Sequence, residues 1–458
     1  MNSNHVNPKR PALIYAATVF LTFLFIYNLI LGTGLIPGAD TAVDARTRKL
    51  EDIAARKATV EGSFFDRNGF PISEGTTPGK PATVLFDEAY SHTIGYNSNM
   101  YGTSGLRKLL YDHLFYGGND HTGAAVTLTT HNDLQQYCYD LLAGSEGSII
   151  VMDAETGELL ACASRSHSEV GYNVNEIDQQ FKTYSQYNAF FLNRATMAQD
   201  TAGSIFKILT AASMLENDMG DYMYDDLDGT FKIGSGTIHN YKNAVYGAGI
   251  DLQTALNKSV NVYFASASQE LNARNLQNTA HRFLFGQEIS LDFTTLNSTF
   301  DLGNLSDRML LAQTAYGQGQ VAVSPLQIAM VMAGVINDGT MMKPYLIQQI
   351  TDDGKTIYTA RPEKASNALD KDIARQLQDY LKSTAESYGL TEELYGTVYA
   401  KTGTADQGTN HLNHIYFLAG AQINDHRYVI LADRSNTSQT SGALKQTVSS
   451  VLTYLGGL

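Results

Sequence analysis

Residues 11–31 form a long apolar stretch that carries no charged side chain. About twenty such residues, wound as a helix, match the thickness of the hydrocarbon layer of a bilayer. The sequence therefore predicts a single transmembrane helix. Lys9 and Arg10 precede it, and their positive charge favours a cytoplasmic tail over 1–10, with the rest of the chain outside the cell membrane. A cleaved signal peptide is the alternative, but the stretch is longer than a typical signal core and no clear cleavage site follows it.

The region that follows, 32–143, has a mixed pattern. Apolar residues at helical spacing between Asp40 and Val60 indicate a short helix that leaves the membrane as a stalk. Asn68-Gly69 lies between two apolar runs and predicts a hairpin, while residues 132–142 have the pattern of a helix. We expect a stalk and a small accessory (pedestal) module here.

The pattern of a larger domain begins near residue 144. Residues 147–164 have the pattern of strand, turn and strand, and a mostly helical middle follows. Three further strands are predicted at 397–404, 414–423 and 426–433, before an amphipathic helix at 443–455. We therefore predict an α+β domain (an α/β sandwich) over 144–458, in which an antiparallel five-stranded sheet is flanked by helices and carries a largely helical insert subdomain.

Charge and cysteine content narrow the possible partners. The 458 residues include 32 Lys and Arg against 46 Asp and Glu, which gives a formal charge of -14. No basic run occurs beyond the extreme N-terminus, so a nucleic-acid partner is not expected. Cys138 and Cys162 are predicted to be small buried residues and not a disulfide, because a chain of this size needs no such staple.

Ser204 and Lys207 form the first candidate for chemistry. Gly203 can place a turn before the apolar run that follows, so we expect Ser204 near the first turn of a helix, with Lys207 one turn further on the same face. A lysine can take the proton of a serine only if it is kept neutral, and the apolar neighbours Ile205 and Phe206 supply desolvation. Free amides at the helix start would stabilise a tetrahedral oxyanion. The pattern predicts that Ser204 attacks an acyl carbon.

Ser259 and Asn261 form the second candidate, within a stretch of helical pattern. Ser259 can relay a proton between Lys207 and a leaving amine, and Asn261 can hold an amide of the substrate. Taken alone, such a pair is usually a solvated helix face. The pair becomes a candidate for chemistry because it lies in the chain between the Ser204 motif and a third motif near residue 401.

The third candidate, Lys401-Thr402-Gly403, ends a predicted strand. Lys401 can add positive potential to a site, and Gly403 lets a substrate backbone lie close to the strand. The hydroxyls of Thr402 and Thr404 suit a carboxylate. Three segments far apart in the chain would have to converge on one cleft for these roles to hold.

The patterns S-x-x-K, S-x-N and K-T-G, in this order, are the signature of penicillin-binding proteins and serine β-lactamases. The chain resembles a class B penicillin-binding protein, and the resemblance extends from about 60 to 458 through the blocks DRNGFPI, VTLTTHNDLQ and YGQGQVAVSPLQIA. Two departures are visible. Glu61 stands where the family often has Arg, and Tyr416 where it commonly has Trp.

The resemblance implies a membrane-bound serine D,D-transpeptidase whose substrate is the D-alanyl-D-alanine terminus of a peptidoglycan stem peptide. It implies that β-lactams acylate Ser204, that Lys207 is the general base, and that the backbone amides of Ser204 and Thr404 form the oxyanion hole. No cofactor and no metal are expected. The region before the domain is too short for a glycosyltransferase, so a separate membrane-embedded glycan polymerase is the expected partner.

Two other functions remain open. An enzyme of the same fold could release its acyl group to water, as a D,D-carboxypeptidase or a β-lactamase does, but the anchor and the accessory module favour the transpeptidase. A catalytically silent β-lactam sensor or scaffold is the other alternative, and the intact set of three motifs argues against it.

Three histidines are further candidates for a functional site. His121-Thr122-Gly123 imitates a variant of the third motif, but it precedes the nucleophile and has the composition of a loop. His411 and His414 are spaced as metal ligands can be, yet no Cys or further His lies near them. We expect them to be loop residues at the rim of the active site.

Overall fold

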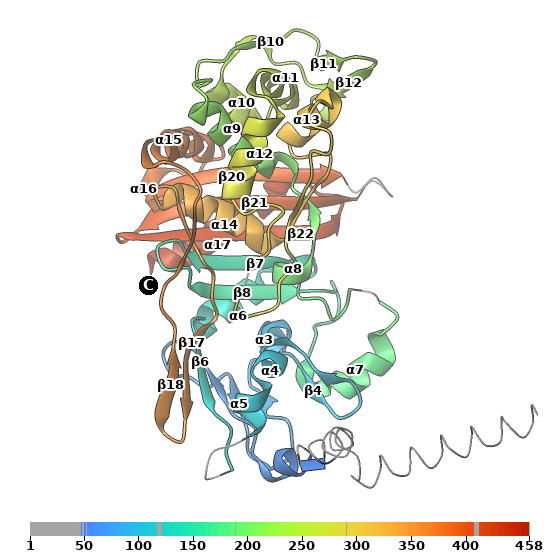
Figure 1. Cartoon of the computed structure of the whole chain (residues 1–458), viewed down its shortest axis with the longest axis vertical. Helices are drawn as coiled ribbons and strands as arrows, with labels where there is room; N and C mark the ends of the chain where they lie inside the picture. The colour runs from blue at the N-terminus through green and yellow to red at the C-terminus, as the bar shows by residue number, and fades with distance from the viewer. Residues whose placement is uncertain are drawn as a thin grey trace, which may run out of the picture.

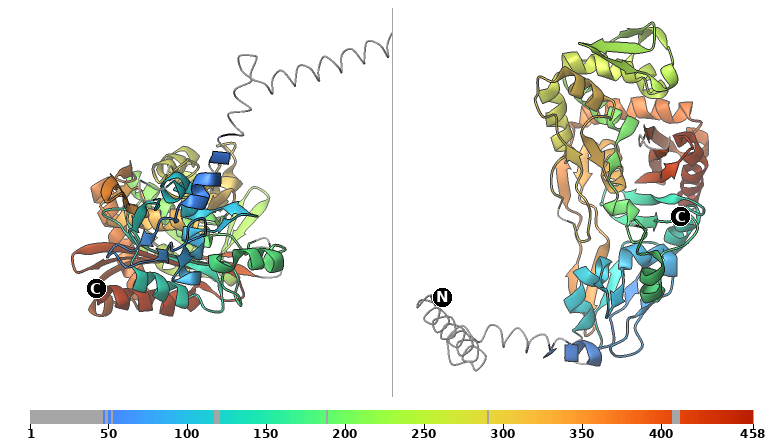
Figure 2. Two further views of the ribbon diagram at one scale, coloured as in Figure 1. Left: turned by 90° about the horizontal axis from the view of Figure 1, so that it is seen from below. Right: turned by 90° about the vertical axis from the view of Figure 1, so that its right-hand side faces the viewer.

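The computed structural model describes residues 47, 50–51, 53–116, 121–187, 189–289, 291–406 and 412–457. The molecule is elongated, with a sheet across its middle, a helical subdomain at one end and the N-terminal module at the other (Figure 1; Figure 2, right). The predicted membrane helix over 11–31 and the tail before it lie outside the described residues. No helix within the described ranges combines the length and apolar character needed to cross a membrane.

The largest sheet contains strands from both ends of the domain. Its order is β20 (Thr397–Asp406), β21 (Asn413–Ile423), β22 (His426–Thr437), β7 (Glu146–Asp153) and β8 (Leu159–Arg165), and every neighbouring pair is antiparallel. The strands are apolar along most of their length because helices cover both faces of the sheet. β20 lies at one edge, with its outer side free to border a cleft.

Successive residues of β7 enter different cores, as the two-residue period of a strand requires. Ile150 belongs to the core that includes buried residues of α9 (Lys207–Glu216) and α14 (Pro325–Ile336), whereas Ile149 belongs to the core that includes those of α6 (Asn132–Asp140) and α17 (Lys445–Gly456). The sheet therefore lies between two helical layers, and the mixed α/β content predicted from the sequence is confirmed.

The helical subdomain lies above the β20 edge of the sheet in Figure 1. Its described residues form four short helices and two small strand pairs, β10 (Tyr224–Asp226) with β13 (Gly247–Ile250) and β11 (Thr230–Ile233) with β12 (Gly236–His239). The helices are α10 (Leu252–Lys258), α11 (Asn261–Leu271), α12 (Ala273–Arg282) and α13 (Arg308–Ala315). α9 contacts α11 and α12, and the 3-10 turn that precedes it, η2 (Gly203–Phe206), contacts β20, so this segment joins the subdomain to the sheet.

The N-terminal module borrows a hairpin from the later chain. Its sheet has the order β1 (Phe64–Phe65), β6 (Ala125–Leu128), β17 (Ile347–Asp352) and β18 (Lys355–Thr359). β17 pairs with β6 in antiparallel fashion, and Figure 1 shows β17 and β18 reaching down from the large domain. The expected boundary near residue 143 therefore does not separate the strands of the two regions, because the N-terminal sheet includes β17 and β18 from the later part of the chain.

Local predictions in this module are confirmed. Residues 53–58 are helical, and α6 covers most of the predicted helix over 132–142. The turn at Asn68-Gly69 forms with Gly69 N donating to Asp66 O at 2.9 Å. Cys138 and Cys162 are both buried and unpaired, as small core residues are.

Glu61 and Arg107 form a buried ion pair in the same module. Each side chain is only 1 % exposed, and Arg107 Nε donates to Glu61 Oε1 at 2.6 Å. The second oxygen of Glu61 accepts from Ala82 N at 2.7 Å, while Arg107 also donates to Gly95 O at 2.9 Å. The departure from the family at Glu61 is thus matched by a buried cation, far from Ser204 along the long axis.

Candidate active site

Ser204 lies in a single 3-10 turn, η2 (Gly203–Phe206), that leads directly into α9. The predicted position near a helix start is confirmed, and Lys207 is the first residue of α9. Gly203 has φ +54, a left-handed conformation that disfavours other residues, and a Cβ there would lie 3.2 Å from Thr404 O. This glycine lets the nucleophile segment approach the edge of β20.

The amine of Lys207 makes four polar contacts. Its Nζ lies 3.0 Å from Ser204 Oγ and 3.1 Å from Ser259 Oγ. It also donates to Ser259 O and to Asn261 Oδ1, each at 2.7 Å. These two oxygens can only accept, so a neutral amine places its two hydrogens on them. Its lone pair is then left for the hydroxyl of Ser204, which donates its proton to it.

Lys207 is 0 % exposed, and its surroundings oppose a positive charge. Burial is the main cause, and the nearby charge of Lys401 adds to it, so the pKa of the Lys207 amine lies well below its ordinary value of 10.5. A lowered pKa enlarges the neutral fraction of Lys207 at any given pH. The neutral amine is the state that can accept a proton from a serine.

The helical stretch predicted around Ser259 is broken in the structure. α10 ends at Lys258 and α11 begins at Asn261. Ser259 itself adopts the left-handed conformation, with φ +58. The prediction of a continuous helix was wrong because a run of helix-compatible residues does not reveal a break that is stabilised by tertiary contacts. The break turns both Ser259 and Asn261 towards Lys207.

Ser259 Oγ lies between two lysines, 3.1 Å from Lys207 Nζ and 3.1 Å from Lys401 Nζ. Asn261 is held from its other side, since its Nδ2 donates to His239 O at 3.1 Å. The three motifs therefore meet at one point. A proton can pass between the two amines through a single hydroxyl.

Lys401 is buried in β20, and the strand continues beyond the motif to Asp406. Gly403 permits close packing, because a Cβ there would lie 3.0 Å from Ile205 Cγ1 and 3.2 Å from a ring carbon of Tyr416. Thr402 and Thr404 both line the cleft. The Thr402 hydroxyl donates to Tyr388 Oη at 3.2 Å, so Thr404 is the more available of the two.

A cleft of about 310 Å³ opens over Ser204. It brings together Ser204, Ser259, Asn261, Thr402 and Thr404. Gly203, expected at the turn before Ser204, also lines it. The remaining lining residues were not singled out from the sequence: Tyr241, Tyr246, Lys258, Tyr316, Gln318, Asn413, Thr440 and Ser441. Only Tyr316 and Gln318 carried a signal, because they belong to a block that resembles the family.

The cleft is electropositive. Among its described lining residues there is no carboxylate, whereas Lys258 lines it and the amine of Lys401 contacts the lining residue Ser259. The chain as a whole carries a charge of -14, so this is a local excess of positive charge. It suits a substrate that ends in a carboxylate.

His414 is not the loop residue that the sequence predicted. It lies in β21, its side chain is 1 % exposed, and it contacts Asp200 and Asp433. The prediction was wrong because both partners are distant in sequence. His411 lies outside the described residues, and the described part of the chain holds no cluster of three His, Cys, Asp or Glu arranged to bind a metal.

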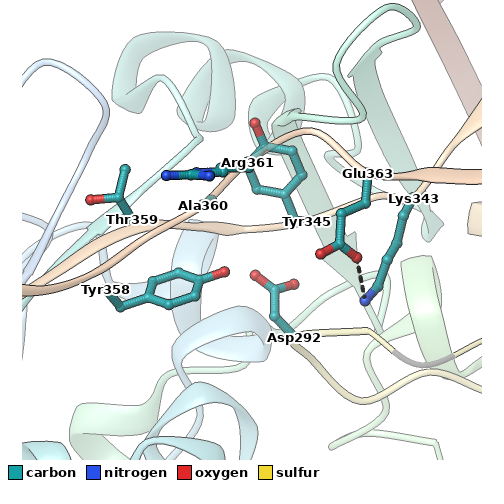
Figure 3. A pocket seen from close by; sticks show the side chains of 8 residues that line it. All are labelled: Asp292, Lys343, Tyr345, Tyr358, Thr359, Ala360, Arg361 and Glu363. Carbon is teal, nitrogen blue, oxygen red and sulfur yellow. Dashed lines mark hydrogen bonds and ion pairs between the residues drawn. The ribbon is translucent and has the colours of Figure 1, made fainter.

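A second cavity, of about 200 Å³, lies away from the three motifs (Figure 3). Asp292 stands in it with its carboxylate accepting from the backbone amides of Leu346 and Ile347, and Lys343 pairs with Glu363 at 3.4 Å. These charged groups are engaged within the protein. The cavity offers no group comparable to the paired Ser204 and Lys207.

A serine facing a desolvated lysine, with a second hydroxyl leading to another amine, defines a serine acyltransferase site. The family model described as penicillin binding protein transpeptidase domain matches residues 147–452. The chain therefore belongs to the penicillin-binding protein transpeptidase family.

Known relatives agree with this assignment. The chain is 27 % identical over 399 residues to the peptidoglycan D,D-transpeptidase PbpA of Mycolicibacterium smegmatis, which covers 78 % of this chain and 80 % of the relative. The solved D,D-transpeptidase domain of a peptidoglycan glycosyltransferase from Eggerthella lenta is 26 % identical, with a TM-score of 0.78 over 88 % of this chain and all of that one.

A third relative shares the fold at lower identity. Penicillin-binding protein A of M. tuberculosis, solved as an imipenem acyl-enzyme complex, is 20 % identical and has a TM-score of 0.77. The match covers 88 % of this chain and all of that one. The fold is therefore the penicillin-binding transpeptidase fold, of mixed α/β content.

Proposed function

We propose that this protein is a serine D,D-transpeptidase that crosslinks peptidoglycan stem peptides through an acyl-enzyme on Ser204. One observation carries the proposal: the buried amine of Lys207 lies 3.0 Å from Ser204 Oγ, with its hydrogens drawn to carbonyl oxygens. That arrangement supplies a base for the nucleophile without a histidine. It is the feature a binding-only protein does not need.

Acylation begins when Ser204 Oγ attacks the carbonyl carbon of the penultimate D-alanine and its proton moves to Lys207 Nζ. The oxygen of the tetrahedral intermediate is stabilised by the backbone amides of Ser204 and Thr404, and one such donor contributes roughly a hundredfold to a thousandfold in rate. The Cβ position of Gly203 lies 3.2 Å from Thr404 O, which supports the close approach of these two backbones.

The leaving amine receives its proton through Ser259. The proton passes from Lys207 to the Ser259 hydroxyl, which gives up its own proton to the nitrogen of the departing D-alanine as the C–N bond breaks. Lys401 lies 3.1 Å from the same hydroxyl and adds positive potential near the terminal carboxylate, which Thr404 also binds. Asn261 holds a substrate amide. A β-lactam acylates Ser204 by the same route.

Release of the acyl group completes the reaction. The amine of a second stem peptide attacks the ester carbon and loses a proton to Lys207 by way of Ser259. Lys207 then returns a proton to Ser204 Oγ as the ester C–O bond breaks, which frees the serine. Attack by water instead would make the enzyme a D,D-carboxypeptidase or a β-lactamase. The relative from M. smegmatis is named a transpeptidase and aligns over most of both chains, which favours the amine as acceptor.

The proposed function includes a division of the whole chain into a membrane-anchoring part and an active part. We place a cytoplasmic tail over 1–10, a membrane anchor over 11–31, a stalk and pedestal module over 32–143 and the transpeptidase domain over 144–458. The active site then works outside the cell membrane, beside a separate membrane-embedded glycan polymerase. The support for this part is the uncharged stretch of 21 residues over 11–31, because about twenty residues in a helix match the thickness of a bilayer.

The test uses the full chain in detergent, a fluorescent penicillin and a thioester of a D-alanyl peptide with D-alanine as acceptor amine. We expect one stable penicillin adduct per chain and more aminolysis than hydrolysis of the thioester. Rapid loss of the adduct, or hydrolysis alone, would contradict transpeptidation.

Ser204→Ala is the control for the nucleophile. We expect it to remove the adduct completely and to leave the thermal unfolding temperature nearly unchanged, because the Ser204 hydroxyl is hydrogen-bonded to the Lys207 amine and does not cap a helix. Ser213→Ala, in the middle of α9, is the matched serine-to-alanine change, because Ser213 Oγ is buried without a hydrogen-bond partner. An adduct that persists in Ser204→Ala overturns the assignment of the nucleophile.

A further inference from the structure

His414 links β22, inside the central sheet, to the short strand that precedes the nucleophile segment. Its Nδ1 lies 2.6 Å from Asp200 Oδ2, in β9 (Asp200–Thr201), and its Nε2 lies 3.0 Å from Asp433 Oδ1, in β22. Asp433 also accepts from the hydroxyl of Ser148, in β7. The histidine and Asp433 are each 1 % exposed, so this chain of contacts lies inside the protein.

The contact between His414 and Asp200 reaches the segment that carries Ser204. β9 is only two residues long, and its described pairing is with β15 (Val321–Val323). The chain then continues through Ala202 into the η2 turn that holds Ser204. The backbone of β9 thus belongs to a separate small sheet, and the Asp200 side chain is what connects the segment that carries the nucleophile to the central sheet.

A ring stack extends the link to the third motif. The rings of His414 and Tyr416 are parallel within 14°, with centroids 4.4 Å apart, and Tyr416 Oη donates to Thr201 O at 3.4 Å. A ring carbon of Tyr416 lies 3.2 Å from the Cβ position of Gly403. One histidine thus contacts, directly or through one ring, both the strand before Ser204 and the strand that carries Lys401.

The charge of His414 follows from what faces it. Burial disfavours the imidazolium, but the hydrogen bonds and charges of Asp200 and Asp433 outweigh burial and raise the pKa of His414 to about 9. Tyr416 is the other titratable group against the ring, and burial with the two carboxylates raises its pKa well above 10. At neutral pH the imidazolium donates from both nitrogens to two carboxylates.

We propose that His414 is a positioning residue for Ser204, whose imidazolium fixes β9 to the sheet and so sets the distance between the nucleophile and the edge of β20. The inference rests on the proposed function, since it concerns the rate at which Ser204 is acylated. It assigns His414 no contact with substrate. Loss of the link displaces the nucleophile segment and slows the chemical step, while the cleft that binds the ligand keeps its lining.

The sign of the pH dependence follows from the raised pKa. The folded value of about 9 exceeds the ordinary 6.5, so the link is fully present below about 6.5 and is lost as the pH rises through about 9. Acylation by the native enzyme should therefore fall on the alkaline side of its profile. Removing one of the two carboxylates should bring that fall to lower pH.

The experiment measures the acylation of the full chain in detergent by a fluorescent penicillin, separated into the binding constant and the rate of the chemical step, from pH 6 to pH 10. Asp200→Asn is the informative variant, because the Asp200 side chain is 27 % exposed and the amide keeps an oxygen facing Nδ1. We expect the chemical step to slow about tenfold at pH 8 with binding unchanged, and the alkaline fall to move down by about one pH unit.

Two further variants separate positioning from stability. His414→Gln, which has no charge to lose, should be slow at every pH and should lack the alkaline fall. Asp338→Asn is the matched control, since Asp338 is 23 % exposed and pairs with Lys371 away from the cleft. It should leave the pH profile unchanged.

The outcomes distinguish this inference from the function on which it rests. If the native enzyme forms no penicillin adduct, the proposed function fails. If the native enzyme is acylated but Asp200→Asn and His414→Gln keep its rate and pH profile, the positioning role is refuted. A lower unfolding temperature in Asp200→Asn with an unchanged pH profile also refutes it, because a purely structural contact gives that result.

Discussion

Asn261 Oδ1 accepts a hydrogen bond from Lys207 Nζ at 2.7 Å, while the amide nitrogen of the same side chain donates to His239 O at 3.1 Å. The second contact fixes the orientation of the amide, because only its nitrogen can donate to a carbonyl. The oxygen is therefore the atom that faces the lysine. Asn261 orients the amine of Lys207 without adding a negative charge next to it.

Asn261→Asp should slow acylation through the pKa of Lys207. A carboxylate 2.7 Å from Nζ favours the charged ammonium, so the pKa of Lys207 should rise back towards 10.5. In the native enzyme, acylation should increase as the pH rises through the lowered pKa of Lys207, and in the variant this increase should come at higher pH. Penicillin acylation rates measured from pH 5 to pH 10 report the shift.

The same substitution at Asn304, an exposed residue of the 303–307 loop, is the control for a gain of negative charge. It should leave the profile where it is. A profile for Asn261→Asp that is merely lowered at all pH values would show that Asn261 acts only through substrate binding.

Ser259 allows the relay to be separated from the fold. Its left-handed conformation costs a residue with a side chain roughly 1 kcal/mol relative to glycine, so Ser259→Gly should unfold at higher urea than Ser259→Ala. Both variants lack the hydroxyl between the two lysines, and acylation by penicillin should fall on the order of a hundredfold in each. Unequal acylation rates that follow the stabilities would show that backbone strain, and not the hydroxyl, governs the rate.

Gly403→Ala should reduce acylation through crowding. The new Cβ would lie 3.0 Å from Ile205 Cγ1, and Ile205 directly follows the nucleophile, so Ser204 must shift. We expect the chemical step to slow about tenfold to a hundredfold, as measured with fluorescent penicillin. Gly456→Ala, where no atom lies within 4 Å of the added Cβ, should be acylated like the native enzyme.

Glu61→Gln tests the buried pair of the N-terminal module. Removing the charge leaves the Arg107 guanidinium buried without its partner, which typically costs about 3 to 5 kcal/mol. Urea unfolding followed by circular dichroism should show this loss, while the remaining folded protein keeps its acylation rate. Glu392→Gln, in the exposed pair with Lys382, should have no measurable effect on unfolding. Equal effects of the two substitutions would mean that the burial of the Glu61 pair has no energetic consequence.

Local sequence was enough to predict most of the sheet and the identity of the site. Apolar runs such as those of β7 and β21 are long and bounded by turns, so their strands follow from composition and spacing. Ser204 and Lys207 are close in sequence, and the helical repeat alone brings them together. Their catalytic role was inferred from the order of the three motifs along the chain. No single motif would have been enough for that inference.

Features that depend on distant partners could not be predicted. The break at Ser259 is stabilised by contacts with Lys207 and Lys401, and nothing in its neighbours demands it. His414 was placed in a loop because Asp200 and Asp433, which enclose it, come from other segments. Polar residues in an apolar strand read as surface unless their partners are known.

The N-terminal sheet is completed by β17 and β18, which come from the later part of the chain, and this affects the order in which the chain can fold. A protein made from its N-terminus usually folds domain by domain as it emerges. Here β6 ends at Leu128, yet the strand that pairs with it begins only at Ile347. The first part to leave the ribosome must therefore wait, with one strand edge uncovered, until most of the chain has been synthesised, and a fragment truncated before that point would remain open to pairing with other chains.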